Sequence, residues 1–252
     1  MTEATALYAY AVLPGDAALP RSPATILPGA PLGLLHAAGC AALVSAVPRN
    51  AFAARPVQEP AQGAWIAART HAHHATIAAA AAEGPLLPLA FGAVFDGPAP
   101  LRAWLAARGP RLGAALTQVA GCAEFTLRLE EDTEGHIAWL DAHDEDLRSL
   151  AEDARNAGAD DAFRLGGRRA RRLTEARHAR QQALVRDLAA RLQRHARLLP
   201  GEMTALVRDA DVPALRADLD RIARDLSGTG LALRLAGPWP PYASARAALS
   251  EV

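Results

Sequence analysis

The sequence predicts an α+β protein built from two domains. Short apolar or alternating segments typical of strands occur in both halves of the chain, and alanine- and leucine-rich helical segments lie between them. Gly121 separates two such sets. We expect an N-terminal α+β domain over residues 1–120 and a C-terminal ferredoxin-like domain over residues 121–252, the latter with a long helix and a charged helical insertion.

The composition excludes some classes of protein. The chain has 252 residues, which is enough for two ordinary domains. Charged residues make up 21% and the formal net charge is zero, which argues against a disordered chain and against a globally basic nucleic-acid-binding protein. Cys40 and Cys122 lie in apolar strand-like stretches and are interpreted as buried reduced thiols, and a disulfide between them would need the two strands to touch. The sequence has no CxxC pair.

No targeting or membrane segment is predicted. Residues 1–14 carry no basic region before a short apolar run, so they do not resemble a signal peptide. No uninterrupted apolar run reaches the roughly 18 residues of a transmembrane helix. From these patterns we expect a soluble, cytoplasmic protein with no membrane partner.

The N-terminal elements follow from apolar runs and their breaks. Residues 7–13 predict a buried strand that ends at Pro14-Gly15, and residues 14–31 predict a loop rich in proline and glycine. Residues 33–38 and 41–47 predict a hairpin that turns at Gly39.

Helical segments follow the hairpin. Residues 65–83 predict an alanine-rich helix that stops at Gly84-Pro85. Residues 86–95 form an apolar run interrupted by proline and glycine, which suits an edge strand or a bulge. Residues 100–107 and 112–119 predict two short helices that are separated at Gly109-Pro110.

The C-terminal half opens with a strand and continues with a reversal of charge. Residues 123–129 alternate as in a half-buried strand. Residues 130–161 hold twelve Asp or Glu, whereas residues 164–197 hold eleven arginines. Leucines at i, i+4 spacing predict a long amphipathic helix over residues 173–199.

The remaining C-terminal elements complete a pattern of strand, helices, strand, helix and strand. Residues 203–207 predict a short strand, residues 213–226 a helix with proline in its first turn, and residues 231–235 the last strand. The string GPWPPY at residues 237–242 suits a cap on the core, an aromatic docking surface, or both.

Three clusters could carry chemistry, and each has a simpler interpretation. His71 and His74 share a helix face at the spacing of metal ligands, but no cysteine or carboxylate lies close to them in sequence, so a solvated or partly packed helix face is favoured. The carboxylates around Asp141 and Asp144 could do acid–base work only in a pocket that separates their pKa values, and a solvated face is favoured.

The third cluster is basic. Arg168, Arg169, Arg171 and Arg172 could bind nucleic-acid phosphates, but aromatic residues for base stacking are nearly absent beside them. A mobile charged insertion that docks a protein partner is the favoured interpretation, with the acidic segment as an intramolecular or partner-borne counter-charge. No glycine-rich phosphate loop or GxSxG motif is present, and we predict no catalytic residues, cofactor or resident metal.

Strings along nearly the whole chain resemble those of the gas vesicle accessory proteins of the GvpF/GvpL family. The terminal GPWPPY is the most specific, followed by LPLAFG before a Val-Phe pair. The chain departs from the usual family pattern at Ala93, in the strand at 204–207 and at Ala243-Ser244, which leaves open whether it is an F-type or an L-type member. The matching strings are LYAYAV (7–12), LVSAVP (43–48), the helix from Trp65, LLPLAFGAVF (86–95), GCAEFTLRL (121–129), GHIAWL (135–140), MTALVRD (203–209) and LALRLAGPWPPY (231–242).

The resemblance implies two α+β domains and a non-catalytic role at gas vesicles. Family members are accessory or minor structural components that bind other gas vesicle proteins, including the small hydrophobic shell protein, during assembly. An enzyme or a metal-binding protein that uses His71 and His74 is the alternative. The residues expected to contact protein partners are Leu89, Phe91, Phe95, Arg168, Arg169, Arg171, Arg172, Pro238, Trp239 and Tyr242.

Overall fold

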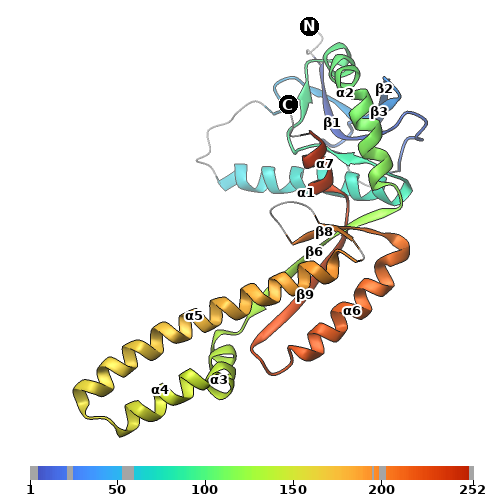
Figure 1. Cartoon of the computed structure of the whole chain (residues 1–252). Helices are drawn as coiled ribbons and strands as arrows, with labels where there is room; N and C mark the ends of the chain where they lie inside the picture. Colours follow the sequence, from blue (N-terminus) through green and yellow to red (C-terminus); the bar gives the residue numbers. More distant parts are fainter. Residues whose placement is uncertain (1–4, 22–24, 53–59, 195, 199–202, 250–252) are drawn as a thin grey trace. The chain divides into compact units, whose positions relative to one another are not determined.

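The computed structural model confirms the α+β class and divides into two compact units (Figure 1). The first unit comprises residues 1–124 and 237–252, and the second comprises residues 125–236. The last residues of the chain thus group with the first unit by contact, whereas the sequence expectation places them in the second domain. The structure describes residues 5–21, 25–52, 60–194, 196–198 and 203–249.

The first unit is built around one sheet with strand order β2-β3-β1-β4, and β5 also pairs with β1. Ala38 and Gly39 form the two-residue turn of the β2–β3 hairpin, and both have positive φ, 50° and 75°, as the tight turns of twisted hairpins require. The elements of this unit are β1 (Thr5–Pro14), β2 (Leu32–Ala37), β3 (Cys40–Pro48), α1 (Pro60–Glu83), β4 (Leu87–Pro88), β5 (Val94–Phe95), α2 (Pro98–Val119) and α7 (Tyr242–Leu249).

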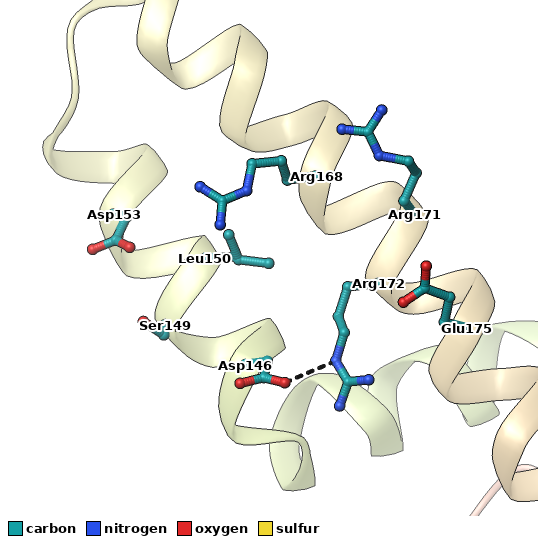
Figure 2. Close-up of a pocket in the computed structure, with 8 residues that line it drawn as sticks. All are labelled: Asp146, Ser149, Leu150, Asp153, Arg168, Arg171, Arg172 and Glu175. Atoms are coloured by element: carbon teal, nitrogen blue, oxygen red, sulfur yellow. Dashed lines mark ion pairs between the residues drawn. The ribbon is translucent and has the colours of Figure 1, made fainter.

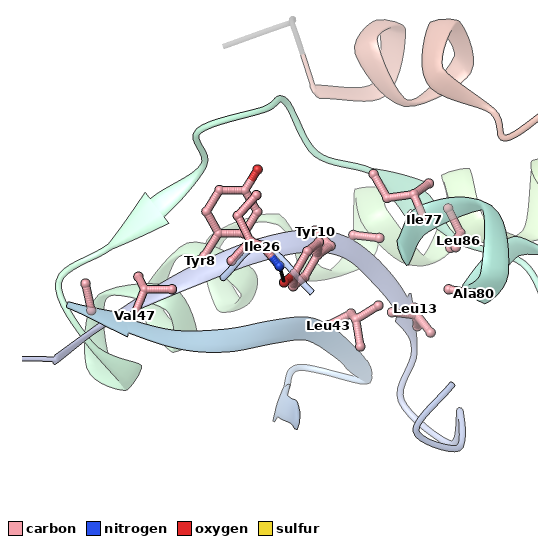
Figure 3. Close-up of a cluster of buried hydrophobic side chains, with 11 residues drawn as sticks. Tyr8, Tyr10, Leu13, Ile26, Leu43, Val47, Ile77, Ala80 and Leu86 are labelled. Carbon is pink, nitrogen blue, oxygen red and sulfur yellow. Dashed lines mark hydrogen bonds between the residues drawn. The ribbon is translucent and has the colours of Figure 1, made fainter. Parts of the chain in front are cut away.

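The core of the first unit lies between β1, β3 and α1 (Figure 3). Tyr8 and Tyr10 of β1 pack with Leu43 of β3 and Ile77 of α1, and all four side chains are fully buried. The Tyr10 hydroxyl hydrogen-bonds Ser45 Oγ at 3.0 Å and accepts a hydrogen bond from a loop amide at 2.8 Å. Each buried hydroxyl therefore keeps polar partners, which removes the cost of burying it alone.

Helix α2 is continuous, so the prediction of two helices broken at Gly109-Pro110 is wrong. Four leucines of α2 form one buried stripe, and burying them is worth roughly 6–12 kcal/mol, more than the roughly 3 kcal/mol cost of an interior proline. Gly109 has a packing reason, because a Cβ there would lie 2.9 Å from the Cβ of Ala38. The four leucines are Leu101, Leu105, Leu112 and Leu116.

The second unit has the strand order of a ferredoxin-like fold. Its sheet has the spatial strand order β7-β8-β6-β9. Along the chain, helices connect β6 to β7 and β8 to β9. This confirms the predicted class of the C-terminal half. The elements are β6 (Cys122–Glu131), α3 (Thr133–His143), α4 (Glu145–Asn156), α5 (Ala159–Leu192), β7 (Ala196–Leu198), β8 (Thr204–Arg208), the 3-10 turn η1 (Asp209–Asp211), α6 (Val212–Asp225) and β9 (Leu231–Trp239).

The long helix begins earlier and ends earlier than predicted. The leucine row suggested a helix through residue 199, but residues 196–198 form the edge strand β7, paired with β8 from Ala196↔Val207 to Leu198↔Ala205. Strand β8 is almost fully buried, so its backbone groups need partners on both edges. The need to pair with β8 therefore decides the structure of residues 196–198, although the leucine spacing there suits a helix.

The tail also differs from its prediction. The last strand extends to Trp239, and residues 242–249, which the sequence suggested to be a short alanine-rich tail, form α7. Glu124, only 2% exposed, holds the start of this helix, accepting hydrogen bonds from the amides of Ala243 at 2.9 Å and Ser244 at 2.6 Å. A carboxylate at a helix N-terminus satisfies amides that have no partner within the helix.

Candidate protein-binding surfaces

Acidic and basic segments of the second unit lie face to face. Arg169 pairs with Asp141 of α3 at 2.5 Å. Arg172 pairs with Asp144 at 2.6 Å and with Asp146 at 3.1 Å. These ion pairs hold α5 against the two shorter helices, so the acidic segment serves as an intramolecular counter-charge. Residues 164–172, which the sequence suggested to be a mobile charged insertion, are part of α5.

A cluster of ion pairs and hydrogen bonds around Glu131 connects α5 to β6 and α3. Both oxygens of the Glu131 carboxylate are used, with His136 Nδ1 at 2.7 Å, Arg177 Nε at 3.0 Å and Gln181 Nε2 at 2.7 Å. The Arg177 guanidinium, with the His136 hydrogen bond, lowers the pKa of Glu131 to about 2. His136 is fully buried beside Gly230, where a Cβ would lie 2.0 Å from the His136 amide nitrogen, so only glycine fits there.

An aromatic stack supports the same helix. The Trp139 ring lies between the stacked ring of His143, with ring centroids 4.2 Å apart, and the Arg180 guanidinium, 3.3 Å from the ring centroid. Burial lowers the pKa of Arg180. Leu140 and Leu147 complete the small core beneath α5. The helical hairpin is therefore held by packing as well as by charge.

The hairpin of α4 and α5 carries a polar groove of about 520 Å³ (Figure 2). Arg168 extends toward α4 over Leu150, whereas Arg171 extends outward from α5. Both arginines are exposed, and neither makes an ion pair with any residue that the structure describes. The groove is lined by Asp146, Ser149, Leu150, Asp153, Arg168, Arg171, Arg172 and Glu175.

The three apolar residues predicted as contacts at 89–95 differ in exposure. Leu89 is only 6% exposed and belongs to the core, so it offers no surface to a partner. Phe95 is half-buried against Trp104. Phe91, 38% exposed, remains at the surface over an aromatic cluster that includes Phe52. Burial therefore removes Leu89 from this candidate surface, and Phe91 is its most exposed predicted contact.

The histidine helix serves the core through its middle histidine. His73 is 1% exposed, and its Nδ1 lies 2.8 Å from the hydroxyl of Tyr8. That hydroxyl also accepts a hydrogen bond from the Gly92 amide at 3.2 Å. Because His73 also hydrogen-bonds the Leu89 backbone, its ring is satisfied in the neutral form. Burial, with the nearby His74, lowers the pKa of His73 to about 4.

The geometry does not favour metal binding by His71 and His74. His74 Nδ1 lies 2.6 Å from the Tyr242 hydroxyl, which engages one of the two expected ligands. Within the described ranges, no three side chains of histidine, cysteine, aspartate or glutamate come together as a metal ion would need. Cys40 is buried, as expected, whereas Cys122 is only half-buried, so the expectation of a buried thiol is wrong there.

The string GPWPPY at residues 237–242 contains exposed residues and one residue that packs against the core of the first unit. Tyr242 is bonded to His74 and packs against the core of the first unit, and burial raises its pKa to about 12. Trp239 is 49% exposed and Pro238 is exposed as well. Tyr242 therefore has a structural role, and Pro238 and Trp239 are the part available to a partner.

Several of these residues were not found from the sequence. Glu131, His136 and Glu124 carry no motif, and their roles depend on partners 5 to 120 positions away. The available signal was burial: Glu124 and Tyr8 lie in strands whose neighbours are apolar. Among the described helices, none is long and apolar enough to cross a membrane.

The structure defines a two-unit α+β protein whose distinctive surfaces, an arginine-bearing groove and exposed aromatic residues, suit contacts with other proteins. The family model of the gas vesicle synthesis protein GvpL/GvpF matches residues 6–243. The chain therefore belongs to the GvpL/GvpF family, as its sequence strings suggested.

Curated relatives and solved structures agree with this assignment. The chain is 34% identical over 181 residues to gas vesicle protein L2 of Halobacterium salinarum, a match covering 63% of each chain. It is 25% identical over 187 residues to gas vesicle protein L of Haloferax mediterranei, a match covering 67% of this chain and 58% of that protein. The matches thus span less than two thirds of the length of these relatives.

Solved structures share the fold at low sequence identity. The crystal structure of gas vesicle protein GvpF from Anabaena sp. PCC7120 superposes with a TM-score of 0.73 at 15% identity, covering 96% of this chain and 98% of that one. The structure of GvpF from Microcystis aeruginosa gives a TM-score of 0.65 at 16% identity, covering 95% and 98%. These likenesses establish the fold.

Proposed function

We propose that the protein is an accessory or minor structural component of gas vesicles that acts by binding other gas vesicle proteins, including the small shell protein, during assembly. The observation that carries this proposal is the match of the GvpL/GvpF family model over residues 6–243. The proposal places the protein at the gas vesicle, in the cytoplasm, with no membrane or nucleic acid as partner and no catalytic step.

A binding role has physical support in the exposed side chains. Trp239 and Phe91 keep 49% and 38% of their surface exposed, and large aromatic side chains are enriched among the residues that dominate protein interfaces. A shell subunit that is hydrophobic must be kept from aggregating before it enters the shell. An exposed aromatic side chain on a rigid unit can cover part of such a surface.

The test is co-purification of the tagged full-length chain with the shell subunit. We expect retention by the unchanged chain and loss of most of the retained subunit in Trp239→Ala, because the substitution removes an exposed contact without opening the core. Leu19→Ala is the matched control, since Leu19 is an apolar residue of the first unit with 48% exposure. Circular dichroism checks that both variants stay folded.

The outcomes separate the parts of the proposal. If Leu19→Ala and Trp239→Ala reduce the amount of retained shell subunit equally, Trp239 is not a specific contact. If the unchanged chain retains no shell subunit, direct shell binding is wrong, and another accessory protein becomes the partner to test.

A further inference from the structure

The hairpin of α4 and α5 is packed unevenly along its length. Its base, which contacts α3, holds the buried side chains Leu147 and Ala176 and the half-buried Leu173. The structure describes every residue from 148 to 175, and none of their side chains is buried. The outer part of the hairpin therefore lacks the apolar burial that supplies most of the stability of helices in folded proteins.

The polar contacts of the hairpin follow the same division. Arg169 and Arg172 connect α5 to aspartates of α3 and of the start of α4 at 2.5–3.1 Å. Between residues 148 and 168, all of which are described, each ion pair joins two residues one turn apart in the same helix. Such exposed pairs add little stability, and none of them connects α4 to α5.

The groove of about 520 Å³ lies between these outer parts of the two helices (Figure 2). Asp153 of α4 and Arg168 of α5 line it, and both are exposed. Leu150 and Leu165 are the two leucines of residues 148–168, and each is only half-buried. An open polar space thus lies where a closed apolar core would hold two helices together.

Two consecutive glycines mark the boundary between the outer part and the base. Gly166 and Gly167 lie inside α5 just before Arg169, and a Cβ at either glycine would meet nothing within 4 Å. Packing therefore does not require glycine at these positions. Because glycine loses more conformational freedom on folding than alanine, each one lowers the stability of the helix. The pair weakens α5 at the point where its ion pairs to other helices begin.

Each outer helical segment is too short to be stable by itself. Residues 148–156 complete α4 beyond Leu147, and residues 159–165 begin α5 before the glycine pair. Both segments are shorter than the roughly 12 residues below which an isolated helix is marginal in water. Since they bury no side chain against each other, their pairing adds little to that marginal stability.

We propose that residues 148–168 form an arm that opens and closes independently of the rest of the second unit, with Gly166-Gly167 as its hinge. Opening breaks the helical hydrogen bonds of the arm, while the ion pairs of Arg169 and Arg172 keep the base closed. The arm carries Phe163, which is 85% exposed, and opening adds its two half-buried leucines to the exposed apolar surface. Segments of low local stability are those that a bound partner can reshape at the least cost.

Hydrogen–deuterium exchange of the full-length chain, followed by mass spectrometry of overlapping peptides, measures this opening. We expect the amides of residues 150–166 to exchange at least about tenfold faster than those of residues 173–180, after correction for intrinsic rates. The variant Gly166→Ala/Gly167→Ala should slow exchange in the arm about tenfold or more and leave the base unchanged, because alanine favours the helix at both positions. Gly113→Ala is the matched control, since Gly113 is a helical glycine of α2 that also meets open space, and it should leave exchange in the arm unchanged.

A second variant tests what keeps the base closed. Arg169→Gln/Arg172→Gln removes the ion pairs to the aspartates and should bring exchange of residues 173–180 closer to that of the arm. The proposal is overturned if the arm and the base of the unchanged chain exchange within about threefold of each other. It is also overturned if the double glycine variant, shown to be folded by circular dichroism, leaves exchange in the arm unchanged or slows the arm and the base equally. None of these measurements involves the shell subunit, so failure here leaves the co-purification test unaffected.

Discussion

The buried histidine of α1 makes the stability of the first unit depend on pH in a predictable way. His73 is 1% exposed, and its pKa falls from 6.5 to about 4, mainly because burial penalises the charged ring. A group whose folded pKa lies below its unfolded value binds protons more readily in the unfolded chain. Its contribution to stability is therefore fully present above about pH 6.5 and is lost as the pH falls toward 4.

The expected size follows from the two pKa values. Between about pH 8 and about pH 5, the difference in proton binding at His73 should lower the free energy of unfolding by about 2 kcal/mol, and below pH 4 the loss levels off near 3 kcal/mol. The variant His73→Gln cannot take up a proton. It should be less stable than the unchanged chain at pH 8, because it disturbs the bond to Tyr8, but its stability should fall about 2 kcal/mol less on acidification.

Urea unfolding of the full-length chain, followed by circular dichroism at both pH values, measures this difference. Contributions that the two chains share cancel in the comparison. His71→Gln is the control, because His71 is exposed on the same helix, and it should keep the pH dependence of the unchanged chain. Equal pH dependence of His73→Gln and the unchanged chain, within about 0.5 kcal/mol, would refute the reasoning.

Three further predictions concern packing and charge at single positions. Glu131→Gln should destabilise the second unit by about 1–2 kcal/mol near neutral pH, after allowance for solvent screening, and the difference should shrink as the pH falls from about 4.5 toward 2, where the carboxylate itself becomes protonated; urea unfolding at several pH values checks this. Gly109→Ala should destabilise the first unit by about 1 kcal/mol or more through contact with Ala38, whereas Gly113→Ala, which meets open space in the same helix, should stabilise it by up to about 1 kcal/mol, and thermal unfolding of the pair would contradict the packing argument if both substitutions stabilise. Glu124→Ala should remove the cap of α7 at a cost of about 1 kcal/mol and speed amide hydrogen exchange in that helix, while unchanged exchange would show that the cap is not needed.

Local patterns predicted the elements, and long-range packing decided where they end. The hairpin at Gly39 and the alternating strand before residue 130 follow from neighbouring residues alone, and both are confirmed. The break expected at Pro110 does not occur, because two leucines before it and two after it pack as one buried stripe. The helix expected to reach residue 199 gives way to β7, because a buried strand elsewhere in the chain needs a partner at its edge.

The same distinction holds for the surfaces. Charge counts predicted that an acidic and a basic segment oppose each other, and the pairs of Arg169 and Arg172 with aspartates confirm the intramolecular form of that prediction. The counts could not say which arginines are used, since that depends on the side of α5 that faces its neighbours. Apolar content predicted a surface around Leu89, but the same property also marks a core residue, and the structure places Leu89 inside.

Cross-linking in cells that form gas vesicles tests the central claim most directly. The tagged full-length chain would be cross-linked during vesicle formation, purified under denaturing conditions and analysed by mass spectrometry. The account predicts direct cross-links from this chain to gas vesicle proteins, including the small shell protein. Cross-links confined to proteins unrelated to gas vesicles, while the vesicles form normally, would contradict it.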